Sequence, residues 1–542
     1  YTVFSDDPSK VQKDPDVKPR TWSNVLVPDF VQQDGKGLPD NIVERLGIGG
    51  KLVDVNKWEK FEPASLFGDF HPSQDAELKS VRFPVAKTEE LRARILQGGS
   101  MPSVMIVDSF FDAKHCDLPQ DFVVYDCSSA VDRDAKVCPI VSGDFHYQGS
   151  ASGQATASMS ASLTHPTGIS VPPAREKCGD AGRFSLETPQ QTEAFIRERH
   201  GTHLAGIIAS RWDGFGAGGI NPMAKIIGVQ VDMDNLTDEG YGSWLLRVIG
   251  RIMFEQQVHV VNLSLGYLPK QPTMATSDQE RHEWLSELIE NHGTGVLFVA
   301  AAGNTKETDG CFLTPACLGL TQDNVVTVVA LDTDGGAVLS GSNSNSGFAL
   351  GADGEGILGT MPLNKYGDMS GSSQSAAIVS GAVSLALALG ERWTPRGTRE
   401  RLIACSDVSR DLMGAMVGGK LDIECFLDGG RDRTVDEDGD VKSAKLVRVD
   451  RGGQASGELE FFNNGTSRTE PIPIADILGF QRVENDPADI VLFLQPESNP
   501  DAKVVRLEGS IPQDQELVFR EADGPRSKLK VDEVVKFTRR AI

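Results

Sequence analysis

Five short runs of consecutive apolar residues dominate the middle of the chain. They are VMIVD (104–108), IIGVQVD (226–232), VHVVNLSL (258–265), GVLFVAAAG (295–303) and NVVTVVALD (324–332). Continuous β-branched runs, as opposed to alternating ones, indicate strands that are buried on both faces of a sheet. Helical stretches at 243–256 and 277–291 lie between these runs. This alternation predicts an α/β fold, in which a parallel sheet carries helices on both faces.

The regions before and within this pattern differ from it. Residues 1–100 are rich in Pro, Asp and Lys and lack strong periodicity until 87–97, where a short helix is expected. We interpret them as an N-terminal extension or a pro-segment. Residues 113–190 interrupt the pattern and include a Gly/Ser/Ala/Thr tract at 147–164, which is typical of a loop. We therefore predict an insertion at about 113–190 inside a central domain of 101–428.

The last part of the chain, 429–542, begins with an acidic linker. Its DEDGD run at 436–440 does not have the spacing of an EF-hand loop, so a solvated linker is the better interpretation. Short β-type segments follow, among them GELEFF, IVLFL and ELVFRE, with frequent turns between them. This arrangement predicts a β-rich, sandwich-like C-terminal domain.

The net charge of −24 and the pI of about 4.8 limit the kinds of partner. Such a field repels nucleic acid and anionic lipid, so we expect no nucleic-acid partner. It suits basic substrates or bound cations such as calcium, and solubility alone explains it equally well. The chain has no run of about 18 or more apolar residues, so no transmembrane segment is expected. No signal peptide is visible, but the chain begins with Tyr1, so this absence says nothing about the compartment.

All eight cysteines lie in the middle of the chain. An even number is compatible with disulfides and an oxidising compartment, so the expected location is extracellular or periplasmic, with the cytoplasm as the alternative. Eight cysteines allow 105 pairings, and the sequence does not choose among them. Cys311 and Cys317 could close a small loop or remain two free thiols. The sequence also leaves the oligomeric state open.

Four motifs follow one another along the central domain. VMIVDSFFD ends a predicted strand at Asp108, and RHGTHLAGIIAS carries His200, which we expect to open a helix. VAAAGNT ends another strand at Asn304, and SGSSQSAAIVSGAVSLAL begins a helix of small residues at Ser373. Active sites in parallel sheets lie at the carboxyl ends of the strands, so tertiary structure can bring these side chains together.

These residue types fit nucleophilic catalysis. A serine hydroxyl is a weak nucleophile unless a histidine takes its proton, and a carboxylate must hold that imidazole in the right tautomer and orientation. The chain order Asp–His–Ser differs from the orders used by chymotrypsin-like enzymes and by α/β-hydrolases.

The motifs resemble those of the subtilisin-like serine peptidase (subtilase) family. HGTH is similar to the family's histidine motif, GSSQSAAIVSGA to its serine motif and AAGN to its oxyanion-hole motif, and the likeness runs from about 101 to 428. The resemblance implies a serine endopeptidase whose catalytic triad is Asp108, His200 and Ser373. It implies that the Asn304 side chain forms the oxyanion hole together with the backbone N–H of Ser373.

The resemblance also implies where a protein or peptide substrate binds. NLSLG resembles the strand that pairs with the substrate backbone, so the expected substrate-binding residues are Ser264, Leu265, Gly266, Ala301, Ala302 and Gly303. The chemistry requires no cofactor. The excess of acidic residues, and the calcium binding that is common in the family, are compatible with structural calcium, but no residue is assigned to a metal.

Departures from the family pattern keep an alternative open. Phe110 follows Asp108-Ser109 where the family has glycine, and Gln374 and Ala377 replace the usual Met and Pro. The alternative is a divergent pseudoprotease or binding scaffold with the same fold. An esterase or transferase with the same triad is a further possibility, although NLSLG favours peptides. His203 is expected to pack on its helix. A zinc pair with His200 is disfavoured because no HExxH motif is present.

Overall fold

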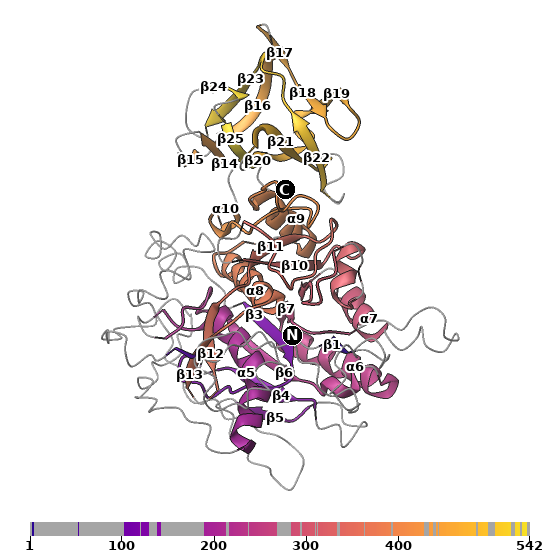
Figure 1. Cartoon of the computed structure of the whole chain (residues 1–542), viewed down its shortest axis with the longest axis vertical. Helices are drawn as coiled ribbons and strands as arrows, with labels where there is room; N and C mark the ends of the chain where they lie inside the picture. The colour runs from indigo at the N-terminus through magenta and orange to yellow at the C-terminus, as the bar shows by residue number, and fades with distance from the viewer. Residues whose placement is uncertain are drawn as a thin grey trace.

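The computed structural model describes residues 3–4, 52–53 and, with short gaps, 102–128, 138–142, 189–267, 283–427 and 433–538. The helix expected at 87–97, the loop tract at 147–164 and the acidic run at 437–440 lie outside these residues. Figure 1 shows an α/β region that carries the main sheet, and a group of strands, in orange and yellow, at one end of the molecule. The helices α9 (Pro395–Cys405) and α10 (Ile423–Leu427) lie between the two regions.

The central sheet has eight strands in the order β11–β10–β9–β7–β3–β6–β4–β5. Seven of them run parallel, and only β5 is antiparallel to its neighbour β4. The five predicted runs form β3, β6, β7, β9 and β10, so the predicted α/β fold with a parallel sheet is confirmed. The strands are β3 (Ser103–Asp108), β4 (Val123–Asp126), β5 (Ile140–Ser142), β6 (Lys225–Gln230), β7 (Val258–Leu263), β9 (Leu297–Ala301), β10 (Val325–Leu331) and β11 (Leu350–Asp353).

β4 and β5 lie within the range that the sequence predicted as an insertion. β4 pairs in parallel with β6 and extends the main sheet, since its FVVY run is buried like the other strands. Part of the range 113–190 therefore belongs to the sheet. The cysteines and loop-like residues around this run obscured a strand of only four residues.

Helices cover both faces of the sheet. Alternate residues of β3 face opposite ways, so Val104 and Ile106 join one apolar cluster, whereas Met105 and Val107 join another. The first cluster includes residues of α5 (Pro189–Ala209), α8 (Ser372–Ala388) and α9. The second includes residues of α6 (Glu239–Glu255) and α7 (Glu283–Asn291). Each β3 side chain thus finds an apolar partner, which explains the continuous apolar run.

α8 is enclosed by the rest of this region. It packs against α5 and against the strands β7, β9, β10 and β11, and all but one of its side chains are buried. Its sequence of Ser, Ala, Gly and Val keeps the helix narrow enough for this position. At Gly381 the approach is closest, because a Cβ atom there would lie 2.6 Å from the Cβ atom of Ile220.

Shorter elements border the sheet. The hairpin of β12 (Ile357–Met361) and β13 (Lys365–Met369) pairs with β2 (Leu52–Val53), and β8 (Gly266–Tyr267) pairs in parallel with β1 (Val3–Phe4). Three single turns of 3₁₀-helix are η4 (Met233–Asn235), η6 (Ala316–Leu320) and η7 (Ile474–Asp476). None of the helices in the described part of the chain is long and apolar enough to cross a membrane.

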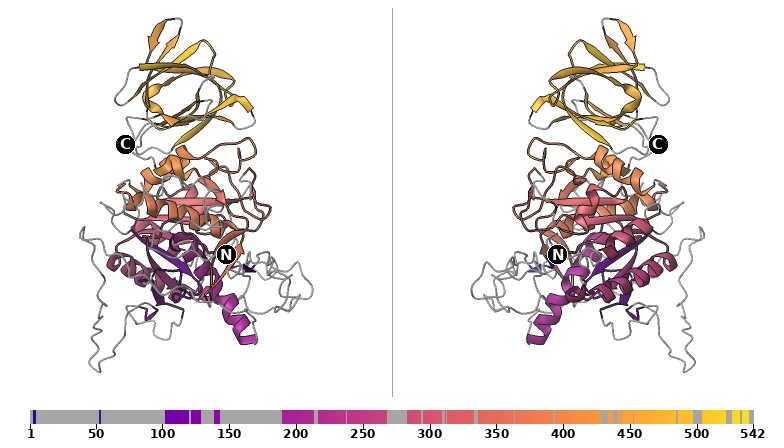
Figure 2. Two further views of the ribbon diagram at one scale, coloured as in Figure 1. Left: turned by 90° about the vertical axis from the view of Figure 1, so that its left-hand side faces the viewer. Right: turned by 90° about the vertical axis from the view of Figure 1, so that its right-hand side faces the viewer.

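The C-terminal region consists of two antiparallel sheets around one apolar core, so the β-rich C-terminal region is confirmed (Figure 2). The sheet orders are β15–β14–β25–β20–β21–β22–β18–β19 and β17–β16–β23–β24. The strands are β14 (Arg433–Asp436), β15 (Val441–Lys442), β16 (Ala444–Arg451), β17 (Gln454–Ser456), β18 (Glu458–Asn463), β19 (Arg468–Pro473), β20 (Ile477–Val483), β21 (Asp486–Leu494), β22 (Val505–Ser510), β23 (Gln515–Glu521), β24 (Arg526–Lys530) and β25 (Val534–Thr538).

Disulfides join Cys127 to Cys138, Cys311 to Cys317 and Cys405 to Cys425. Of the two alternatives left open for Cys311 and Cys317, the structure has the loop disulfide.

Candidate active site

Asp108 ends β3, the strand between β6 and β7 near the centre of the sheet, and it is fully buried. Both of its carboxylate oxygens are engaged. Oδ1 accepts hydrogen bonds from the backbone N–H of Ser109 at 2.7 Å and from its hydroxyl at 3.1 Å. Oδ2 lies 2.7 Å from Nδ1 of His200. Asp108 therefore holds the histidine ring while Ser109 holds Asp108.

His200 lies well inside α5, which begins at Pro189, so the expectation that it opens a helix is wrong. The preceding turns are helical because Pro189 provides a favourable first position and helix-forming residues such as Glu193, Ala194 and Arg197 follow it. The ring is 2% exposed. A carboxylate can only accept, so Nδ1 carries the proton toward Asp108 and Nε2 is the basic nitrogen.

Burial and the neighbouring charge set the protonation of this pair. Burial lowers the pKa of His200 below 6.5, and the charge and hydrogen bond of Asp108 oppose this only in part. Burial alone would raise the pKa of Asp108, but the interaction with His200 outweighs it and holds that pKa below 3.8. At neutral pH the pair therefore consists of a carboxylate and a neutral imidazole, as a general base requires.

The backbone beside this pair accommodates the unusual Phe110. Phe110 lies outside the left-handed region, so its position does not require the glycine that the family has there. The next residue, Phe111, packs against Gly201 of α5, where a Cβ atom would lie 2.5 Å from the Phe110 carbonyl oxygen and 2.7 Å from the Phe111 ring. A glycine beside His200 thus makes room for the two phenylalanines.

Ser373 is the second residue of α8. The helix follows Gly371, whose φ of 141° favours glycine, and its first turn directs backbone N–H groups and positive partial charge toward this end. The Ser373 hydroxyl is buried, and among the described residues none serves as its hydrogen-bond partner. The packing of α8 on α5 and β3 brings Ser373, His200 and Asp108 to one region, but the structure contains no hydrogen bond from Ser373 to His200.

Asn304 follows β9 and contacts the start of α8. Its Oδ1 accepts from the backbone N–H of Ser372 at 3.0 Å and from the Ser372 hydroxyl at 3.1 Å. The amide group Nδ2 is therefore the donor of this side chain. The hydroxyl of Ser372 also accepts from the backbone N–H of Gly303 at 2.9 Å, so Ser372 joins the two segments.

Asn343 shapes the Asn304 loop, although its role was missed from the sequence. It is buried, and its Oδ1 accepts from the backbone N–H groups of Thr305 and Glu307 at 2.8 and 3.0 Å. Its Nδ2 donates to the carbonyl of Ala302 at 3.1 Å. The amide thus bridges both sides of Asn304. Asparagine within the run GSNSNSG is common in turns, and no local pattern distinguishes this one.

The segments expected to bind substrate take different parts in the site. The side chains of Leu265, Ala301 and Ala302 are buried in the two apolar clusters, so these residues could meet a substrate only through their backbones. Gly266 pairs with Val3 of β1, and Gly303 is engaged with Ser372.

Ser264 faces inward and supports the serine. Its hydroxyl donates to the carbonyl of Ser373 at 3.1 Å and accepts from Asn262 at 2.9 Å. Asn262 Oδ1 in turn accepts at 3.0 Å from the hydroxyl of Ser380, which lies about two helical turns after Ser373 on α8. This buried series of polar groups fixes the position of Ser373 relative to β7.

Gln374 and His203 are further buried polar residues next to the proposed triad. Both amide atoms of Gln374 lack a hydrogen-bond partner within the described structure. His203 Nε2 lies 3.0 Å from the carbonyl of Ile357 and 3.2 Å from that of Gly367. Burial lowers the pKa of His203 to about 3, so it stays neutral and attaches α5 to the β12–β13 hairpin. The described residues contain no group of three or more His, Cys, Asp or Glu that could hold a metal ion.

Comparison with known proteins identifies the family of the chain. The model of the subtilase family matches residues 99–421, which is more than half of the chain. The major intracellular serine protease of Bacillus subtilis is 32% identical over 39% of this chain and 62% of its own length. The intracellular serine protease of Paenibacillus polymyxa is 34% identical over 34% of this chain and 52% of its own. Subtilisin E of Bacillus subtilis is 30% identical over 38% of this chain and 49% of its own length, so the chain spans about half of these relatives. The chain belongs to the subtilase family.

Proposed function

We propose that the protein is a serine endopeptidase that uses Asp108, His200 and Ser373 as its triad. The observation that carries this proposal is the buried contact of 2.7 Å between His200 Nδ1 and Asp108 Oδ2, beside the helix that begins at Ser372. Structural ion pairs are usually made by lysine or arginine. A neutral histidine that is held by a carboxylate, on a helix that packs against the helix carrying the serine, has the arrangement of a general base.

In this mechanism, Ser373 Oγ attacks the peptide carbonyl while His200 Nε2 takes its proton. Asp108 stabilises the imidazolium that forms, and His200 then gives the proton to the leaving amine. The developing oxyanion accepts hydrogen bonds from the Asn304 amide and the backbone N–H of Ser373, supported by the α8 dipole. Binding of substrate must bring Ser373 Oγ into hydrogen-bonding distance of His200, since catalytic hydrogen bonds often tighten only in the substrate complex.

The expected substrate is an extended protein or peptide segment. The backbones of Ser264–Gly266 and Ala301–Gly303 would flank it and form strand-like hydrogen bonds. The pairing of β1 with β8 supports this, because Gly266 already accepts a neighbouring strand there. It also supports the interpretation of residues 1–100 as a pro-segment. Deletion of residues 1–100 with no change in activity or folding would contradict the pro-segment but not the triad.

The cysteines bear on the location of the protein. Three disulfides among the described residues support an oxidising compartment, extracellular or periplasmic. The cytoplasmic alternative is supported by the names of two relatives, which are intracellular proteases. The chemistry proposed here requires no cofactor.

The second candidate is a pseudoprotease or binding scaffold. It is favoured by the Ser373 hydroxyl, which has no hydrogen-bond partner among the described residues. The two candidates differ in one respect that can be measured, namely whether Ser373 is activated.

Labelling with a fluorophosphonate probe tests the proposal. We expect the wild type to be labelled and the Ser373→Ala and His200→Ala variants to remain unlabelled. Ser384→Ala, which removes another buried hydroxyl of α8, is the matched control and should be labelled like the wild type. Absence of labelling in the wild type and in the chain lacking residues 1–100 would favour the pseudoprotease. Cleavage of a nitrophenyl ester without cleavage of casein would point to an esterase.

A further inference from the structure

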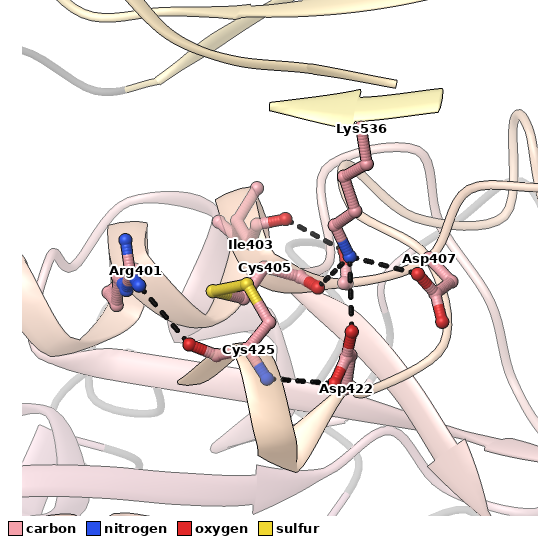
Figure 3. The surroundings of a disulfide bond; sticks show 8 residues. Arg401, Ile403, Cys405, Asp407, Asp422, Cys425 and Lys536 are labelled. Carbon is pink, nitrogen blue, oxygen red and sulfur yellow. Dashed lines mark hydrogen bonds and ion pairs between the residues drawn. A yellow bond between two sulfur atoms is a disulfide. The ribbon is translucent and has the colours of Figure 1, made fainter. Parts of the chain in front are cut away.

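A buried lysine of the C-terminal region reaches into the α/β region. Lys536 lies on β25 and is 6% exposed. Figure 3 shows its side chain pointing from that strand toward the disulfide Cys405–Cys425. Its Nζ donates to the carbonyl of Cys405 at 2.5 Å and lies 2.9 Å from Asp407 Oδ1 and 3.3 Å from Asp422 Oδ2. All three acceptors belong to the α/β region.

Apolar residues around this lysine join the two regions into one core. Five residues of the C-terminal strands and their border belong to the same apolar cluster as Val408, Met416 and Phe426: Leu478, Val483, Val491, Phe493 and Val504. Glu400 of α9 accepts from the backbone N–H of Val504 at 3.0 Å. Such burial resembles the interior of a domain more than a hinged contact between two independent domains.

The charges at this interface make its geometry specific. One ammonium faces two carboxylates, and all three side chains are at most 9% exposed, so loss of the lysine would remove a positive charge that both carboxylates face in a nearly buried place. Groups of this kind contribute little net stability when compared with apolar residues, but they strongly penalise misplacement. Lys536 therefore fixes where the segment that follows α9 lies.

That segment, 406–421, connects the interface to the proposed nucleophile. Asp407 and Lys420 exchange two backbone hydrogen bonds at 2.7 and 2.8 Å. The neighbours of Lys420 bond to Gly351 of β11 at 2.9 and 2.8 Å, and Lys420 Nζ lies 2.9 Å from Asp353 Oδ1 on the same strand. The end of the segment is thus attached to β11 at Gly351 and Asp353.

β11 in turn holds the first turn of α8. The Ser375 hydroxyl donates to the carbonyls of Ala352 and Asp353 at 3.0 and 3.1 Å. The backbone N–H of Gly371 donates to the carbonyl of Gly354 at 2.6 Å. Ser373 lies between these two anchored residues.

From these contacts we infer that the C-terminal β region positions the nucleophile, with Lys536 as the positioning residue and segment 406–421 and β11 as the connection. The inference rests on the proposed role of Ser373. According to this inference, the C-terminal sheets contribute to the chemical step by holding Ser373 in position.

The test replaces Lys536 in the full chain. Lys536→Met should slow fluorophosphonate labelling by about tenfold per folded molecule and lower kcat on a peptide by a similar factor, with KM little changed. Amide hydrogen exchange at 371–375 should become faster. Lys528→Met is the matched control. Lys528 lies in the same region and also pairs with two carboxylates, Asp450 and Glu516, but its side chain is half-exposed and both partners belong to this region. This variant should label and exchange like the wild type.

The outcomes are separable. If Lys536→Met melts at a lower temperature but labels and exchanges at 371–375 like the wild type, Lys536 is only a structural clamp and the inference is overturned. If the wild type is not labelled, the proposed function fails, while the exchange at 371–375 still decides the inference.

If Lys536→Met does not fold, Arg506→Met provides the same measurements. Arg506 donates to the carbonyls of Met416 and Val417, at 2.7 and 2.9 Å, in the connecting segment. It should slow labelling by about threefold, a smaller effect than that of Lys536→Met, because Arg506 contacts the segment only through two carbonyl groups. Unchanged labelling and exchange in this variant would overturn the inference.

Discussion

The α/β region and the C-terminal region use buried polar groups differently. In the parallel sheet, strands are mostly apolar, and the buried polar side chains of the site lie at or near their carboxyl ends, as with Asp108 on β3 and Asn262 on β7. In the antiparallel sheets, a strand such as β18 alternates between buried and exposed residues along its length. The parallel sheet collects polar side chains at the carboxyl ends of its strands, whereas in the antiparallel sheets the residues of a strand alternate between core and solvent.

The difference separates two kinds of mutational effect. Polar groups at the carboxyl ends of the parallel strands are expected to affect chemistry more than stability, because they bond to one another. Apolar residues inside the antiparallel sheets affect stability alone as long as the C-terminal region remains folded. Lys536 crosses this division, since it is a buried charge of the antiparallel region whose partners lie in the α/β region.

The largest expected effect comes from Asp108→Asn. The amide can donate to His200 and so favour the wrong imidazole tautomer, which should lower kcat by about 10⁴-fold. Peptide cleavage kinetics would measure the loss, and circular dichroism should show an unchanged fold. A variant that keeps a tenth or more of the wild-type kcat would exclude Asp108 from the triad.

Phe461→Ala should give the largest effect on stability. Phe461 is fully buried in the core of the antiparallel sheets, so truncation should lower the free energy of unfolding by about 3–5 kcal/mol. Chemical denaturation would measure this loss. The labelling rate of the folded variant should equal that of the wild type, and a slower rate would show that the division between the two regions is less sharp.

Asn304→Ala should lower kcat by about 10²–10³-fold, because one donor to the oxyanion is lost. KM should change little, since the donor acts mainly in the transition state. The alanine also loses the bonds to Ser372, so a parallel measurement of Tm is needed. A large fall in Tm with normal kcat would make Asn304 a structural residue.

The pH dependence gives the smallest effect. His200 must be neutral to accept a proton, so kcat/KM should rise as the pH increases through its pKa. Because burial holds that pKa below 6.5, the midpoint of the rise should lie below 6.5. His203, with a pKa of about 3, should not contribute to this limb. A midpoint above 7 would contradict the electrostatic environment described for His200.

The sequence predicted those features that depend on local periodicity. Five apolar runs became five strands of the parallel sheet, and a run of small residues became the enclosed helix α8. It placed the start of α5 too late, because the histidine motif was mistaken for the beginning of the helix that contains it. It did not separate β4 from its loop-like surroundings.

The contacts that require tertiary structure could not be predicted. Asn343 is distant in sequence from Asn304, and only the fold brings its side chain to the loop that carries Asn304. Lys536 belongs to a strand in which a charged residue usually faces water, and nothing in its neighbours signals two carboxylates more than 110 positions earlier. Roles of Asp108, His200, Asn304 and Ser373 remain predictions until labelling and kinetics test them.

The narrowness of α8 has a consequence for the variation that this protein can tolerate. A helix with all but one of its side chains buried offers almost no solvent-facing position and little spare volume, so larger side chains cannot be accommodated. At Gly381 even one added carbon would collide with Ile220. In a library of random variants, α8 should stand out as a continuous band of rejected substitutions. Such a band would lack the periodicity of 3.6 residues that surface helices produce, because no face of α8 is free to vary.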